Sequence, residues 1–116
     1  MDYASAYRLA KDIRESEEYK TYHVLKESVM GEETTAALIR EYRKLQVTLQ
    51  MSAVSGQSAD AETMQRFSGI STLLFSKQEV SNFLMAEMRL QQAMADIFKI
   101  VTEAADVELG IPGLEG

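Results

Sequence analysis

His23 is the residue of this chain whose type best suits metal binding, because imidazole is a common ligand of transition metals. Glu27 follows four residues later, so the two side chains would share one face of a helix. Two ligands do not make a zinc site. A di-iron centre of the ferritin type needs two Glu-x-x-His motifs, and the sequence has neither. The pattern therefore favours a half-exposed histidine beside a carboxylate over a metal centre.

Glu87 is the second candidate, because it falls on the apolar stripe of the last predicted helix, between Phe83 and Leu90. A buried carboxylate needs a partner, and Arg40, Arg43 or a tyrosine hydroxyl could supply it. We interpret Glu87 as a structural, buried polar residue. The alternative is a functional acid whose environment tunes its pKa.

Most other chemistry lacks the residues it would need. The 116-residue chain has no cysteine, which rules out disulfides, thiolate metal sites and thiol catalysis within it. It has no G-x-S-x-G elbow for a serine nucleophile and no Gly-rich loop for a phosphate. We therefore predict no catalytic residue, no cofactor and no metal, and a protein that is not an enzyme.

Charge and hydropathy limit the possible partners. The formal net charge is −6, and residues 60–116 alone carry four basic and nine acidic side chains. An acidic surface repels the phosphates of nucleic acids and of anionic lipids. The N-terminus lacks the features of a signal peptide, and no apolar run approaches the length of about eighteen residues that spans a bilayer. We expect a cytoplasmic protein with no direct nucleic-acid binding and no membrane insertion.

Helical periodicity runs through almost the whole chain. Proline is nearly absent and strong helix formers are abundant. Apolar residues recur at steps of three and four in five stretches, at about residues 3–15, 17–30, 32–54, 60–75 and 76–108. We predict an all-α protein: a five-helix bundle with a long antiparallel helical hairpin and a long C-terminal helix. Residues 1–109 are predicted to form one helical domain, and residues 110–116 a flexible C-terminal tail.

Polar residues mark where three of these helices begin. Ser16 is predicted to cap the second helix, and Asp60 or Ser58 the fourth. Ser76 and Glu79 have the spacing of a capping box at the start of the last helix. The fourth and fifth helices would then be joined with almost no loop.

Glycines mark bends and ends. Gly31 is predicted to close the second helix in the left-handed conformation. The segment 55–58 has the composition of a turn, which would join the third and fourth helices around Gly56. Gly69 lies inside the fourth helix, either to allow a close helix approach or as a local weakness. Gly110 and Pro112 are predicted to stop the last helix.

Two long segments carry no charged residue, residues 45–59 and 67–76. A solvent-exposed helix pair normally carries charges on its outer faces. The apolar residues of these segments spread around their helices beyond one stripe, which is typical of a contact surface. The predicted partner or self-association residues are Leu45, Val47, Leu49, Met51, Val54, Phe67, Ile70, Leu74 and Phe75. The alternative is that the other helices cover both sides within the monomer.

Three segments resemble the YlbF/YmcA family of small helical bacterial proteins. They are Ser16-Glu17-Glu18-Tyr19, Leu38-Ile39-Arg40-Glu41-Tyr42-Arg43-Lys44-Leu45-Gln46 and Val80-x-x-Phe83-Leu84-x-Ala86-Glu87-x-x-Leu90. The resemblance extends from about Tyr7 to Ala105. It implies a helical bundle that assembles as a homodimer or a higher oligomer.

The resemblance also implies a non-enzymatic regulatory role in Gram-positive bacteria. Family members influence competence, biofilm formation and sporulation in a complex that adjusts RNA processing by endoribonuclease Y. Partners of this chain would then be a second copy, paralogous family members and such a complex. Some members carry a cysteine-bearing tail implicated in iron–sulfur binding. This chain has no cysteine, so it cannot ligate a cluster with thiols of its own.

Three functions remain open at the level of sequence. The first is an oligomeric adaptor that regulates by binding proteins, which the uncharged segments favour. The second is a helical metal-binding or enzymatic subunit that uses Glu87 and His23. The third is a small RNA-binding subunit. Metal analysis of the purified protein tests the second, and a salt-dependent RNA shift tests the third.

Overall fold

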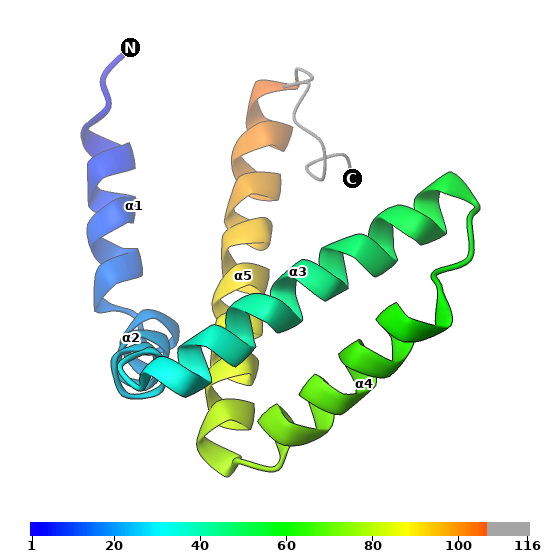
Figure 1. Ribbon diagram of the computed structural model, residues 1–116. Coiled ribbons are helices and arrows are strands. Elements are labelled where there is room, and N and C mark those ends of the chain that lie inside the picture. Colours follow the sequence, from blue (N-terminus) through cyan, green and yellow to red (C-terminus); the bar gives the residue numbers. More distant parts are fainter. Residues whose placement is uncertain (107–116) are drawn as a thin grey trace. The chain divides into compact units, whose positions relative to one another are not determined.

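A computed structural model describes residues 1–106 as five helices, with no strand among those residues (Figure 1). The helices are α1 (Ala4–Glu15), α2 (Glu17–Met30), α3 (Glu33–Ser55), α4 (Ala61–Phe75) and α5 (Gln78–Ala105). The all-α class, the long hairpin and the long C-terminal helix are confirmed. The last helix ends at Ala105, a few residues before the predicted end near residue 108, and Asp106 after it has a φ of 50°. Gly110, Pro112 and the predicted tail lie outside the described residues.

The chain divides into two compact units. Unit 1 contains residues 1–23 and the chain from residue 84 onward, and unit 2 contains residues 24–83. The helices α2 and α5 each pass from one unit into the other. The prediction of one domain stays a prediction, and each unit is described by itself.

Unit 2 has a hydrophobic core. Its largest fully buried side chains are Ile39, Leu74, Val80 and Phe83, which come from α3, α4 and the start of α5. The helices α3 and α4 pack against each other as an antiparallel hairpin (Figure 1). Burying large aliphatic and aromatic side chains stabilises a fold by about 1.5 to 3 kcal/mol each. The burial of these residues therefore stabilises unit 2 and joins its helices in one core.

The turn of this hairpin follows the sequence closely. Gly56 ends α3 with a φ of 76°, in the left-handed region that glycine adopts without steric cost. The Gln57 N–H donates to the Ser52 carbonyl at 3.0 Å. The Asp60 carboxylate then accepts the Thr63 N–H at 2.7 Å and caps α4. The turn around Gly56 and the Asp60 cap are both confirmed.

The junction of α4 and α5 differs from its prediction. Only Ser76 and Lys77 separate the two helices, as expected, but the capping box is wrong. The Ser76 hydroxyl donates back to the Leu73 carbonyl at 2.7 Å, and Ser76 closes α4 in a right-handed helical conformation. The Glu79 carboxylate accepts a hydrogen bond from the Ser28 hydroxyl. A tertiary partner in unit 2 has therefore replaced the local one.

Gly31 differs from its prediction, and Gly69 agrees with one of the two alternatives given for it. Gly31 does not adopt the left-handed conformation, since Gly56 is the only glycine of the described residues with a positive φ. A Cβ at Gly31 would instead lie 2.7 Å from the Glu27 carbonyl oxygen, so a close backbone approach requires glycine there. A Cβ at Gly69 would meet nothing within 4 Å. Gly69 therefore allows no close helix approach and is a local weakness of α4.

Unit 1 contains α1, the start of α2 and most of α5. The Ser16 hydroxyl accepts the Tyr19 N–H at 3.2 Å, so the predicted cap of α2 is confirmed. Among the described residues of this unit only Ala86 is buried. The apolar stripes of α1 and α5 are thus only partly covered within unit 1.

Candidate protein-interaction surface

An exposed apolar stripe runs along α3. Val47, Met51 and Val54 follow one another at steps of four and three, which places them on one side of the helix. Their exposed fractions are 57%, 66% and 87%. At 100° per residue this side is nearly opposite the one that carries Leu45 and Leu49. We call Val47, Met51 and Val54 the hairpin stripe.

The neighbouring helix α4 adds further exposed apolar side chains. Met64, Leu73 and Phe75 are all about half exposed. The Phe75 ring meets the Tyr42 ring edge-on at a centroid distance of 6.0 Å, and Tyr42 stacks on Phe67 at 5.2 Å. Aromatic contacts between α3 and α4 therefore hold part of this apolar surface in a fixed orientation.

The predicted contact residues fall into two groups. Leu45 and Leu74 are buried, and Leu49, Phe67 and Ile70 are half-buried. The exposed members are Val47, Met51, Val54 and Phe75. The surface open to a partner is therefore narrower than the sequence predicted, because the α3–α4 contact covers one side of each helix.

Charge is absent from the outer half of α3 and from the turn that follows it. Residues 45–59 contain no ionisable side chain. Hydroxyls along α3 bond to the helix itself: Thr48 donates to the Lys44 carbonyl and Ser52 to the Thr48 carbonyl, both at 3.0 Å. The ion pair between Arg66 and Glu41, at 2.6 Å, lies outside this segment. The surface can make apolar contacts, and it presents no group suited to acid–base or nucleophilic chemistry.

His23 and Glu87 both belong to unit 1. His23 is exposed, and its ring packs against Tyr19 and Tyr22 at centroid distances of 4.1 and 5.0 Å. Glu87 is half-buried and has an interaction partner. Within residues 1–106, no three His, Cys, Asp or Glu side chains come together in a group that could hold a metal ion. In the same range no helix is long and apolar enough to cross a bilayer.

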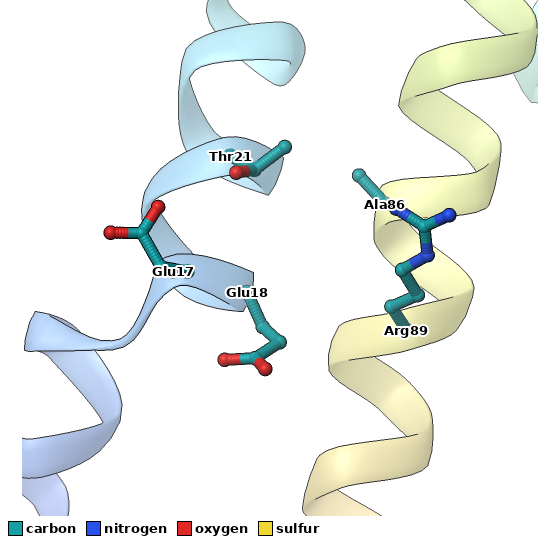
Figure 2. A pocket seen from close by; sticks show the side chains of 5 residues that line it. All are labelled: Glu17, Glu18, Thr21, Ala86 and Arg89. Atoms are coloured by element: carbon teal, nitrogen blue, oxygen red, sulfur yellow. The ribbon is translucent and has the colours of Figure 1, made fainter.

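Two adjoining cavities in unit 1 were not predicted. The first, of about 160 Å³, lies between the start of α2 and α5 and is lined by Glu17, Glu18, Thr21, Ala86 and Arg89 (Figure 2). The second, of about 200 Å³, is lined mainly by apolar residues of α1 and α5, and Glu18 lines both cavities. The apolar stripes of α1 and α5 were both visible in the sequence. Periodicity identifies an apolar face but says nothing of whether another element covers it.

Comparisons with known proteins show which family the chain belongs to. Residues 3–105 match the family model described as "Control of competence regulator ComK, YlbF/YmcA". A UPF0342 protein of Symbiobacterium thermophilum is 31% identical over 107 residues, which cover 92% of this chain and 96% of that protein. A UPF0342 protein of Halothermothrix orenii is 31% identical over 109 residues, which cover 94% of this chain and 91% of that protein.

A solved structure agrees at the level of fold. A protein of unknown function (DUF964) from Bacillus stearothermophilus superposes with a TM-score of 0.68 at 18% identity, covering 90% of this chain and 91% of that one. The family match extends over almost the entire described chain, and the curated relatives match along nearly their full lengths. This chain is therefore a member of the YlbF/YmcA family of regulatory proteins.

Proposed function

We propose that this protein is a non-enzymatic regulatory adaptor that binds protein partners, a second copy of itself among them. The observation that carries the proposal is the hairpin stripe: three exposed apolar residues on the outer half of α3, on the side opposite Leu45 and Leu49. Exposure of uncharged apolar surface to water is unfavourable, and burying that surface in a contact with a partner lowers the free energy. Membership of a family of regulators supports the same role.

The finer role proposed here follows from the family. The chain would act in the cytoplasm of a Gram-positive bacterium, with paralogous family members, in a complex that adjusts RNA processing by endoribonuclease Y. Through that complex it would influence competence, biofilm formation and sporulation. No nucleic acid would bind the chain directly, because its net charge of −6 opposes phosphate.

The test places charge on the hairpin stripe. Val47→Glu combined with Val54→Glu puts two carboxylates on exposed positions, so the fold should persist while an apolar contact there becomes unfavourable. The control is Gln46→Glu with Gln50→Glu, which adds the same charge to exposed positions on a neighbouring side of α3. Sedimentation velocity at tens of micromolar should show a dimer or larger species for wild type and control, and a smaller species for the stripe variant.

Two outcomes decide against parts of the proposal. A monomeric wild type at tens of micromolar would remove self-association. An unchanged oligomer in the stripe variant, with unchanged helical circular dichroism, would remove the stripe as the contact surface. Affinity purification from the native cell then tests the heteromeric role, since endoribonuclease Y and paralogues should co-purify with wild type and not with the stripe variant.

A further inference from the structure

We propose that the larger cavity of unit 1 is a docking groove for an amphipathic helix of a partner protein that carries Lys or Arg beside its apolar stripe. The inference rests on the adaptor role proposed above but concerns a surface separate from the hairpin stripe. The apolar lining of this groove comes from Leu9, Ile13, Leu90, Met94 and Ile97. We call this cavity, with all the residues that line it, the unit 1 groove.

The groove lies between two helices that do not close on each other. No residue of α1 is buried, although its apolar residues recur at helical spacing on one side. Within unit 1, α1 and the second half of α5 run in opposite directions beside each other (Figure 1). Ile13, Leu90 and Met94 are all half-buried. Two amphipathic helices that leave their facing stripes partly open gain stability when a third apolar face fills the space between them.

The dimensions fit a helix. Together the two cavities extend along α5 from Ala86 to Ile97, about 16 Å at 1.5 Å per residue, or three helical turns. A helix of this length presents apolar side chains at i, i+3, i+4 and i+7, the pattern of helix-in-groove recognition. A chain in extended conformation would need its backbone hydrogen bonds satisfied by a strand edge, and the described residues contain no strand.

The charges select the kind of helix. The ionisable residues that line the unit 1 groove are Asp12 and Glu18, both acidic. The basic residues of α1, namely Arg8, Lys11 and Arg14, do not line it, and Lys11 pairs with Glu15 at 3.9 Å. The adjoining cavity adds Glu17 together with one cation, Arg89 (Figure 2). Both cavities together carry three carboxylates and one guanidinium, so a partner helix with basic flanks meets complementary charge.

The same charges disfavour a second copy in this groove. A two-fold dimer contact brings each patch against itself. Asp12 and Glu18 would then face Asp12 and Glu18 of the other subunit, and like charges at an interface are unfavourable. The uncharged hairpin stripe has no such penalty. Self-association therefore suits the hairpin stripe, and a basic partner helix suits the unit 1 groove.

The test uses two fluorescent helical peptides of about 18 residues, long enough to span the groove. Both carry the same leucine stripe; one has Lys and the other Glu at the flanking positions. Fluorescence anisotropy with the full-length protein should show binding of the Lys peptide at least tenfold tighter than binding of the Glu peptide. The preference should shrink in 1 M salt, where the Debye length falls to about 3 Å.

Charge-swap variants keep the test independent of folding. Asp12→Lys with Glu18→Lys changes exposed positions and should reverse the peptide preference. Met94→Asp should abolish binding of either peptide, and Val54→Asp in the hairpin stripe should leave it unchanged. Circular dichroism and the melting temperature show whether each variant is folded.

Three results would overturn the proposal. One is no binding of the Lys peptide at millimolar protein, and another is equal affinity for both peptides. The third is a smaller sedimenting species for the Asp12→Lys, Glu18→Lys variant than for wild type, which would mean that a second copy occupies the groove. Failure here leaves the hairpin stripe untouched. If the Val47→Glu, Val54→Glu variant keeps the wild-type oligomer while the Lys peptide still binds, only the proposed self-association through the hairpin stripe is removed.

Discussion

Unit 1 and unit 2 use the same kind of amphipathic helix to different ends. In unit 2 three helices contribute large apolar side chains to a closed core, and Phe83 is only 1% exposed. In unit 1 the apolar stripe of the same helix α5 continues beyond Glu87, yet Phe98 is 43% exposed. The difference teaches that an apolar stripe shows which face of a helix must be covered, and that among residues 1–106 the cover is complete in unit 2 and only partial in unit 1.

The comparison also separates two kinds of open surface. The hairpin stripe of unit 2 is uncharged and lies on the outside of a unit that already has a core. The unit 1 groove is bordered by the carboxylates of Asp12 and Glu18. It lies between α1, which has no buried residue, and α5. An uncharged surface suits a copy of itself, and an acidic groove suits a basic partner. Together, the two proposed contacts would connect a self-assembly of this chain to another protein.

The largest expected effect tests the comparison directly. Phe83→Ala removes a fully buried ring from unit 2 and should lower the free energy of unfolding by about 3 to 5 kcal/mol. Phe98→Ala is the matched control in the same helix and should cost about 1 kcal/mol or less. Urea denaturation followed by circular dichroism measures both. Equal losses for the two variants would show that unit 1 is as closed as unit 2.

Glu87→Ala should have the next largest effect. Glu87 is half-buried in unit 1 and has an interaction partner, so its removal leaves that partner unsatisfied. We expect a loss of about 1 to 3 kcal/mol, the scale of an orphaned polar group. The exposed Glu103 lies in the same helix, and Glu103→Ala serves as control with little change. If Glu87→Ala melts at the wild-type temperature, the interaction of Glu87 contributes nothing to the stability of unit 1.

Two glycines of unit 2 should respond in opposite directions. Gly31→Ala forces a Cβ to 2.7 Å from the Glu27 carbonyl oxygen and should destabilise by more than about 1 kcal/mol. Gly69→Ala meets open space inside α4 and should stabilise by about 1 kcal/mol. Thermal melts of both single variants measure the sign. A destabilised Gly69→Ala would mean that another surface packs closely on α4.

The smallest expected effect lies at the exposed end of the hairpin, where Asp60 caps α4. The hydrogen bond from the Thr63 N–H holds the pKa of the Asp60 carboxyl below its ordinary value. A lowered folded pKa means that the cap contributes fully above about pH 4, the pKa in the unfolded chain, and is lost as the pH falls through the folded value. The melting temperature of wild type should exceed that of Asp60→Ala at pH 7, and the gap should shrink at pH 2.

Asp60→Asn is the control for this pH dependence. An amide oxygen accepts the same hydrogen bond at every pH, so the gap between Asp60→Asn and Asp60→Ala should stay constant. A wild-type gap that is the same at pH 7 and at pH 2 would show that the carboxylate charge contributes nothing to the cap.

Local chemistry was enough to predict the helices and most of their ends. Steps of three and four identified five helices, and Ser16, Gly56 and Asp60 act at the predicted places because a cap or a turn involves only neighbours in the chain. The capping box at Ser76 failed for the opposite reason. Glu79 accepts a hydrogen bond from Ser28, 51 residues away, and no local pattern contains that contact.

Which apolar faces stay open was decided by tertiary structure alone. The sequence marked Leu45 and Val47 alike as contact candidates, and packing of α4 on α3 buried the first and left the second exposed. The stripes of α1 and α5 read as core, but only the arrangement within unit 1 shows a groove between them. Periodicity depends on a residue's own helix, whereas burial depends on the second surface brought against it, and that surface is distant in the sequence.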